Sequence, residues 1–420
     1  MNSKEFPQTE TNLEMASTLT RRTFMGGVLA ASAMGTEAAG APAADQARPP
    51  EITRKFKLGL VGCGSRGHWI TGFFRRHGGF EFHAVADYFQ EAADRTGNEL
   101  GVDKARRFSG LSGYKRVIES GVEALVIEDV PYFYPEQAKA AVEAGCHVYM
   151  AKPIAVDVPG CLTIGALAKQ ATQKKRCFLV DYQLPTQPAN IEVANRVRNG
   201  ALGRPGQVLS YGFGGGLADP PKGPTPDSRL LGRAWYSDIV FGGDVVLFYD
   251  IHIIDGVIWV MGKKPVSACG RSRICRPNPH GDRTDCAEMV FEFDDGTLWT
   301  HVVHALNDNP DMPSLSASLY GTEATAHIEY GGKVFVRGGA KHYVGQIGSI
   351  YDDGVVRNVA EFYRNLTEGH FDNPTAQRAV DGTLTGILGR EAAARRRYLT
   401  MEELVRENRK MEADLTGFRG

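Results

Sequence analysis

The sequence predicts an α/β protein of two domains, an open parallel sheet covered by helices and then an α+β domain with a largely antiparallel open sheet. Two observations predict this order. Between residues 57 and 181, short apolar runs alternate with amphipathic stretches, as in sheets whose parallel strands are joined by helices. Between residues 208 and 336, strand-like runs follow one another across Gly- and Asp-rich turns, which favours antiparallel pairing.

Composition and charge narrow the class of protein. The 420 residues fit two domains, and a hydrophobic content of 42% is ample for a core. The 48 Lys and Arg residues balance 49 Asp and Glu residues, for a formal charge of −1. A nucleic-acid binder would usually carry a basic surplus, so we expect no nucleic-acid partner.

The N-terminal region differs from the rest of the chain. Arg21-Arg22 precede a short apolar run at 26–35, and Ala41-Pro42-Ala43 offers an A-x-A cleavage site. The apolar run is too short to span a bilayer, and no other segment reaches that length. Because the paired arginines are followed by Phe24, residues 1–44 resemble a twin-arginine signal peptide. We therefore expect export to the periplasm without stable membrane insertion.

The elements of the first domain are predicted in a regular order. Strands are expected at 58–61, 82–86, 124–127, 147–150 and 177–181. Helices are expected at 66–77, 90–100, 135–144 and 158–173. We predict that this domain covers 54–175.

The second domain is predicted to cover 176–420. Its strands are expected at 208–213, 265–273, 287–293, 297–304, 315–320, 324–330 and 333–336. Its helices are expected at 245–261, 355–366, 375–397 and 401–409. The Gly- and Pro-rich segment 214–227 is predicted to be a surface loop that could cover a site.

A glycine motif follows the first predicted strand. Residues 62–67 read G-C-G-S-R-G, which fits G-x-G-x-x-G between a strand and a helix. In that motif Gly62 makes the tight turn, Gly64 admits a pyrophosphate, and Gly67 lets the helix pack on the strand. The motif predicts a Rossmann dinucleotide-binding domain, although a Gly-rich turn is the plainer alternative.

Asp87 strengthens the dinucleotide prediction. It lies twenty residues after Gly67, at the end of the second strand, where a carboxylate would accept hydrogen bonds from ribose hydroxyls. Because the carboxylate would repel a 2′-phosphate, NAD is favoured over NADP. The predicted cofactor contacts are Gly62, Gly64, Ser65, Arg66, Gly67, Asp87, Glu128 and Lys152.

Two further features could carry chemistry. Lys152 follows a predicted strand, and the strand ends of a parallel sheet border the cofactor crevice. On a regular helix over 245–261, Asp244, His252 and Asp255 share one face, and Asp250 lies on the far side. A carboxylate one turn from a histidine can orient the ring and raise its basicity. The alternatives are a surface lysine, a buried structural histidine, and Asp244 as an N-cap.

These motifs together resemble the Gfo/Idh/MocA oxidoreductases over about residues 55 to 410. The resemblance rests on G-C-G-S-R-G, on Lys152-Pro153, on the Gly-Gly and His-x-x-Asp helix, and on the C-terminal Asn373-Pro374. It implies a Rossmann domain, a second domain whose open sheet often forms homo-oligomers, and hydride transfer at a carbon of a sugar, cyclitol or related polyol. By the same resemblance, Lys152 matches the lysine of a Glu-Lys-Pro motif and His252 matches the acid/base histidine.

The sequence departs from the family pattern at three positions. Ala151 replaces the glutamate before the lysine, Phe248 replaces the aspartate four residues before the histidine, and Tyr134 stands where a histidine is common. Glu128 or Asp129 could supply the missing charge. The predicted catalytic residues are Lys152, His252, Tyr134 and Asp255. The predicted substrate contacts are Tyr182, Gln183, Trp235, Tyr236 and Asp244, although Trp235 and Tyr236 could equally pack between domains.

Export bears on the expected reaction. Little free NAD exists outside the cytoplasm, so we expect the nucleotide to travel with the folded protein and to stay bound. A bound cofactor must be regenerated, either by a second substrate or within one redox-neutral cycle of sugar oxidation, elimination, water addition and reduction. The second scheme resembles NAD-dependent glycoside hydrolases. A non-catalytic dinucleotide- or sugar-binding protein is the alternative that the changes at Ala151 and Phe248 favour, whereas the retained Lys152 and His252 speak against it.

The cysteines give a weaker signal. Seven are present, an odd number, and none lies in a C-x-x-C pair, so neither zinc nor thioredoxin chemistry is predicted. A bridge between Cys275 and Cys286 could form in an oxidising compartment, but the sequence alone does not predict it.

Overall fold

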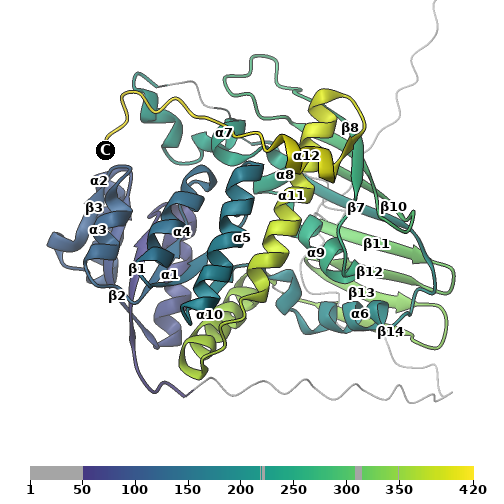
Figure 1. Ribbon diagram of the computed structural model, residues 1–420, viewed down its shortest axis with the longest axis horizontal. Coiled ribbons are helices and arrows are strands. Elements are labelled where there is room, and N and C mark those ends of the chain that lie inside the picture. Colours follow the sequence, from purple (N-terminus) through teal and green to yellow (C-terminus); the bar gives the residue numbers. More distant parts are fainter. Residues whose placement is uncertain (1–50, 218, 220–222, 308–314, 349) are drawn as a thin grey trace, which may run out of the picture. The chain divides into compact units, whose positions relative to one another are not determined.

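A computed structural model describes residues 51–217, 219, 223–307, 315–348 and 350–420 (Figure 1). The predicted signal peptide, 1–44, lies outside these residues. Within the described part of the chain, no helix combines the length and the apolar character needed to cross a membrane.

The first sheet is parallel and six-stranded, in the order β3-β2-β1-β4-β5-β6. Its strands are β1 Phe56–Val61, β2 Phe80–Asp87, β3 Arg107–Ser109, β4 Ala124–Ile127, β5 His147–Met150 and β6 Phe178–Val180. The strand order reverses between β1 and β4, and ligands bind at such a switch point in open parallel sheets. The predicted Rossmann domain is therefore confirmed.

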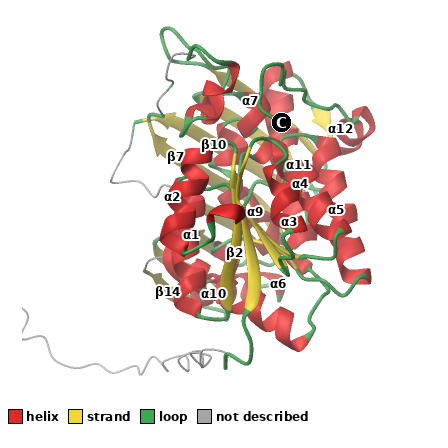
Figure 2. Cartoon of the chain, turned by 90° about the vertical axis from the view of Figure 1, so that its left-hand side faces the viewer, coloured by secondary structure: helices red, strands yellow, loops and turns green. Residues whose placement is uncertain are grey.

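Helices cover both faces of this sheet, as Figure 2 shows, with α1 and α2 on one side and α3, α4 and α5 on the other. Their bounds are α1 Ser65–His77, α2 Gln90–Leu100, α3 Gly113–Glu119, α4 Tyr134–Glu143 and α5 Val158–Gln173. Two-sided cover explains why β4 and β5 are buried along their whole length rather than alternating between buried and exposed residues.

Segments from the C-terminal half complete this first domain. Helix α10, Ile350–Glu368, packs on α1, and its Val355, Val359 and Phe362 share a core with Phe56 and Leu58 of β1. The predicted domain boundary at residue 175 also falls before β6, which belongs to the parallel sheet. The two domains are therefore interleaved along the chain.

The second sheet has nine strands, in the order β14-β13-β12-β11-β7-β10-β9-β8-β15. Its strands are β7 Pro205–Gly215, β8 Ser267–Arg273, β9 Cys286–Glu292, β10 Leu298–Leu306, β11 Leu315–Gly321, β12 Thr325–Glu329, β13 Gly332–Arg337, β14 Tyr343–Ile347 and β15 Leu399–Thr400. Only the β7–β10 pair is parallel among the described pairings, so the largely antiparallel sheet is confirmed.

The remaining helices lie beside this sheet and between the two sheets (Figure 1). They are α6 Pro188–Arg198, α7 Ile239–Gly242, α8 Val245–Phe248, α9 Ile251–Met261, α11 Pro374–Arg395 and α12 Met401–Glu407. Helix α11 contacts both α5 of the first domain and α9 and β8 of the second. Helix α11 therefore packs against both domains.

The helix predicted over 245–261 is not continuous. It breaks between α8 and α9, where the Asp250 N–H donates to the Val245 carbonyl, five residues back. Such a widened turn inserts an extra residue and rotates everything that follows it. The faces calculated for one regular helix are therefore wrong for Asp244 relative to the residues of α9.

Candidate active site

The glycine motif forms a cradle between β1 and α1. A side chain at Gly62, where φ is 92°, would lie 2.5 Å from the backbone of Glu128 and Asp129. One at Gly67 would lie 1.9 Å from the Gly62 oxygen. A Cβ at Gly64 would meet no described atom within 4 Å. The first and third glycines thus pack the turn, and the second leaves the space that a pyrophosphate needs.

A cavity of about 510 Å³ opens at this cradle. The first domain contributes Gly64, Ser65, Arg66, Asp87 and Glu128 to its wall. The second domain contributes Leu230, Leu231, Arg233, Trp235 and Tyr236. The cavity therefore lies between the two domains, with the start of α1 at one side to receive an anion.

Asp87 is fixed at the end of β2. Its Oδ2 accepts a hydrogen bond from Cys63 N at 2.8 Å, and its Oδ1 accepts one from Phe89 N at 2.9 Å. Burial raises the pKa of this carboxyl. Each oxygen keeps a further lone pair for a ribose hydroxyl. The cradle and this carboxylate both fit a dinucleotide.

A cluster of four charged side chains lies at the ends of β4, β5 and β6. Arg66 Nε is 3.0 Å from Glu128 Oε2, and an Arg66 terminal nitrogen is 2.5 Å from Asp181 Oδ2. Lys152 Nζ donates to the Phe248 carbonyl at 2.9 Å. Arg66, predicted as a cofactor contact, thus bridges two carboxylates as well as lining the cavity.

Burial governs how this cluster titrates. Loss of solvent, helped by the charge of Arg66, lowers the pKa of Lys152 to about 7. Burial also raises the pKa of Glu128 to about 7, although Arg66 opposes that rise. Both groups can therefore exchange protons near neutral pH, which suits general acid–base chemistry.

His252 is buried near this cluster. Its Nδ1 lies 2.6 Å from the Tyr330 hydroxyl. Burial, together with the charges of Lys152 and Arg66, lowers the pKa of His252 well below its ordinary value, so the ring is neutral. Lys152 and His252 do not line the cavity, but both lie close enough to Arg66, which does, to feel its charge.

The predicted shared face of Asp244, His252 and Asp255 does not form. Asp255 Oδ1 pairs with Arg378 Nε at 2.9 Å rather than with the histidine. Asp244 accepts hydrogen bonds from Val245 N and from the Thr284 hydroxyl. The break after α8 separates Asp244 from α9, whereas Asp255 stays three residues from His252 within α9 and pairs with Arg378 instead.

The other predicted site residues divide into two groups. Trp235 and Tyr236 line the cavity, and Tyr236 stacks on Phe248 with the rings 4.7 Å apart. Tyr182, Gln183 and Asp244 are not among its lining residues. Gln183 instead donates to Asp181 Oδ2 at 3.1 Å.

The predicted catalytic tyrosine is also locked in place. The Tyr134 hydroxyl donates to the Asp129 carbonyl at 2.7 Å, and burial raises the pKa of its phenol. The phenol of Tyr134 is therefore buried, protonated and hydrogen-bonded to the backbone, which indicates a structural role. Neutral Tyr134 does not replace the charge of a family histidine.

Sequence reasoning missed a buried polar chain next to Lys152. Trp299 Nε1 donates to Ser210 Oγ at 2.6 Å, Ser210 Oγ is 2.7 Å from His301 Nδ1, and His301 Nε2 is 2.7 Å from Asp250 Oδ2. Asp250 and His301 are both fully buried. The charge of Asp250 acts on Lys152 and raises the pKa of that amine against the effect of burial.

Backbone geometry accommodates this chain. A side chain at Gly212 of β7 would lie 1.3 Å from Asp250 Oδ1, so only glycine leaves room for the carboxylate. No local signal in the sequence joins Asp250 to His301, because the contact links the break after α8 to a distant strand. In β10 apolar residues lie on both faces, so the sequence pattern of the strand does not single out His301 as a buried residue.

A cradle shaped for a pyrophosphate, with a buried lysine whose pKa is lowered to about 7 beside the cavity, fits an NAD-binding oxidoreductase. Residues 56–181 match the family model described as the oxidoreductase family, NAD-binding Rossmann fold, and residues 191–327 match the GFO/IDH/MocA C-terminal domain. Together the two models match more than half of the chain. The chain belongs to the Gfo/Idh/MocA family.

One curated relative is an uncharacterized oxidoreductase from Synechocystis sp.. It is 25% identical over 198 residues, which make up 47% of this chain and 50% of the relative. The match thus spans about half the length of that protein.

Solved structures share the fold over more of the chain. Aldose-aldose oxidoreductase from Caulobacter crescentus, complexed with glycerol, has a TM-score of 0.67 at 18% identity and covers 83% of this chain and 100% of its own. Levoglucosan dehydrogenase with NADH and levoglucosan has a TM-score of 0.67 at 16% identity, covering 83% and 100%. GenD2 from gentamicin A biosynthesis, in complex with NAD, has a TM-score of 0.66 at 16% identity, covering 83% and 97%.

Proposed function

We propose that this protein oxidises or reduces a carbon of a sugar, cyclitol or related polyol, using a tightly held NAD. The observation that carries the proposal is Lys152, a buried amine whose pKa of about 7 suits it to take a hydroxyl proton, beside a cavity shaped for a dinucleotide. The sugar-acting enzymes among the structural relatives support the substrate class.

Each side chain has a separate task in this scheme. NAD, when bound, supplies the hydride acceptor. Neutral Lys152 accepts the proton of the reacting hydroxyl, and neutral His252 holds a neighbouring hydroxyl. The Arg66 guanidinium holds Glu128 and Asp181 in place at the strand ends. Trp235 and Tyr236, whose rings meet at 79°, offer aromatic surface against which a sugar ring can lie.

Retention of the nucleotide is supported by a strap over the cavity rim. The C-terminal tail, yellow in Figure 1, runs from α12 back to the first domain. Arg419 O accepts from Leu111 N at 3.0 Å, and Arg419 N donates to the Tyr88 hydroxyl at 2.9 Å. Phe418 packs on Tyr88 and Phe241. Tyr88 and Leu111 both line the cavity, so the tail holds its rim.

The first experiment identifies the nucleotide. Purified mature protein is denatured and filtered, and any released nucleotide is identified by mass spectrometry. Near-stoichiometric NAD supports the proposal and leads to assays of polyols, sugar pairs and glycosides with no cofactor added. Hydrolysis of a glycoside without net redox change would point to the redox-neutral cycle. An empty filtrate, with no binding of NAD or NADP on titration, would overturn the proposal.

Substitution of Gly64 by alanine should weaken NAD binding about tenfold or more without lowering the Tm, because its Cβ meets only the space reserved for the pyrophosphate. Gly62→Ala is the matched control. It adds the same methyl group at φ 92° and against backbone atoms, so it should lower the Tm. The measurements are NAD titration and thermal unfolding. Equal NAD affinities in Gly64→Ala and the unchanged protein would contradict this reading of the cradle.

Removal of residues 409–420 should speed NAD dissociation about tenfold, because the contacts of Arg419 and Phe418 with the rim are lost. Dissociation is followed by displacement of bound NAD with labelled NAD. Glu412→Ala is the control on the same tail, since that side chain is 76% exposed and its ion pair lies at the surface. An unchanged rate of NAD dissociation in the truncated protein would contradict the proposed role of the C-terminal tail in retaining NAD.

Export and self-association are also part of the proposal. Arg21-Arg22 support the twin-arginine route, and replacing both with lysine should retain the protein in the cytoplasm of a fractionated host. Exposed apolar side chains on the nine-stranded sheet, such as Val290, Leu298 and Val344, support a homo-oligomer. Sedimentation measurements test that point.

A further inference from the structure

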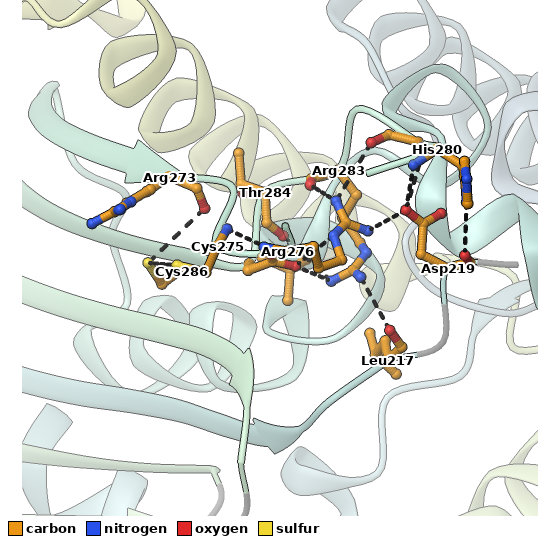
Figure 3. A network of polar contacts seen from close by, with 12 residues as sticks. Leu217, Asp219, Arg273, Cys275, Arg276, His280, Arg283, Thr284 and Cys286 are labelled. Carbon is orange, nitrogen blue, oxygen red and sulfur yellow. Dashed lines mark hydrogen bonds and ion pairs between the residues drawn. The ribbon is translucent and has the colours of Figure 1, made fainter. Parts of the chain in front are cut away.

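Two thiols lie close together at the loop end of the β8–β9 hairpin. Cys275 lies two residues beyond β8, and Cys286 begins β9, where it pairs with Arg273. Their Sγ atoms are 3.8 Å apart (Figure 3). Both are free thiols, Cys275 exposed and Cys286 half-buried. Formation of a disulfide would bring these sulfur atoms to the S–S bond length of about 2.05 Å.

The segment between them, residues 276–285, is here named the hairpin loop. It holds the stretch of chain that follows Trp235 and Tyr236. Arg283 N donates to the Ser237 carbonyl at 3.1 Å, and Asp282 Oδ1 accepts from Ile239 N at 2.8 Å. Gly281 fits against Ser237 so closely that a Cβ would lie 2.0 Å from its carbonyl oxygen. The hairpin loop thus supports one wall of the NAD cavity from behind.

Buried charges fix the hairpin loop at a second point. Arg283 is fully buried and lies 3.2 Å from Asp285 Oδ1. Arg276 pairs with the same carboxylate at 3.2 Å and with Asp219 at 3.3 Å, and Asp219 accepts from His280 N at 2.7 Å (Figure 3). Buried ion pairs are favourable only while every partner stays in place. Opening of the hairpin loop would break the ion pairs of Arg276 with Asp219 and Asp285.

The thiol pair and the charge network share one anchor. Asp285 Oδ2 accepts hydrogen bonds from Cys275 N at 2.6 Å and from Arg276 N at 3.1 Å. Asp285 also immediately precedes Cys286. A disulfide between Cys275 and Cys286 would therefore hold Asp285 in place, and Arg276 and Arg283 both pair with that carboxylate.

We propose that Cys275 and Cys286 form a disulfide that latches the hairpin loop and slows escape of NAD past the Trp235–Tyr236 wall. In this reaction the two thiols lose two electrons and two protons and form one S–S bond. An external disulfide, such as oxidised glutathione or a thiol oxidase of an oxidising compartment, accepts them and becomes two thiols. The effect on NAD rests on the proposed function, whereas formation of the bond does not.

Thiol labelling in the folded, full-length protein tests the bond. The other exposed thiol is Cys269, and Cys63, Cys146, Cys161 and Cys177 are buried. A Cys269→Ser background therefore leaves only the pair open to iodoacetamide. We expect two labels after reduction, no label after treatment with oxidised glutathione, and a mass lower by two hydrogens. Two labels, or two stable glutathione adducts, after that treatment would overturn the proposal.

NAD dissociation tests the latch. In the Cys269→Ser protein we expect oxidation to slow dissociation several-fold and to raise the Tm by a few degrees. The matched control adds Cys275→Ser and Cys286→Ser, and it should show no dependence on glutathione. Equal rates before and after disulfide formation would overturn the latch. Failure to bind NAD in both states would overturn the proposed function instead, and the labelling result would still decide the bond.

Discussion

Replacing Lys152 with methionine should lower kcat for alcohol oxidation by about 10²- to 10⁴-fold, the range expected when a general base is lost. Methionine keeps the buried, unbranched side chain but cannot take a proton. The amine touches the Phe248 carbonyl rather than the glycine cradle, so NAD binding should change little. The measurement compares turnover of the best substrate with NAD affinity by titration.

Lys139→Met is the control for the same substitution at the surface, because Lys139 is 59% exposed on α4. It should alter neither turnover nor NAD affinity. Equal turnover in Lys152→Met and the unchanged protein would remove Lys152 from the reaction. Loss of NAD binding in Lys152→Met would instead assign the lysine to the cofactor.

Replacing Asp250 with asparagine should move the pH profile of kcat to lower pH and lower the maximum about tenfold. The base is the neutral amine, so in the unchanged protein kcat for oxidation should rise with pH around a midpoint of about 7. The negative charge of Asp250 favours the ammonium form of Lys152. Without that charge the amine loses its proton at lower pH, so the midpoint falls. The measurement is kcat against pH in both proteins.

Asp255→Asn is the matched control, because Asp255 is also a buried carboxylate on α9 but pairs with Arg378. In Asp255→Asn the midpoint of the rise of kcat with pH should be the same as in the unchanged protein. Glu128 titrates in the same range, so Glu128→Gln decides which group sets the profile. A rise with pH that persists in Glu128→Gln assigns it to Lys152, and a flat profile assigns it to Glu128.

The features that could be predicted from the sequence depend on local patterns. The strand–turn–helix around Gly62 and Asp87 lies within thirty residues, and the alternation of elements fixes a parallel sheet without knowledge of distant contacts. The largely antiparallel second sheet followed from its successive strands in the same way.

Features that depend on one extra residue or on distant partners could not be predicted. The widened turn at Asp250 shifts α9 by a residue, so the helical angle predicted between Asp244 and the residues of α9 was wrong. His252 finds its partner in Tyr330, and Asp250 finds His301, each from a strand far along the chain. Periodicity carries no information about such pairs.

The interleaving of the two halves has a consequence for synthesis of this protein. The face of β1 and α1 stays uncovered until α10 has left the ribosome, and the rim at Tyr88 stays open until Arg419 has been added. A nascent chain therefore cannot close on its nucleotide before translation of the C-terminal tail. A ribosome that stops before residue 409 would release a protein whose nucleotide site is formed but lacks the contacts of Phe418 and Arg419 with Tyr88.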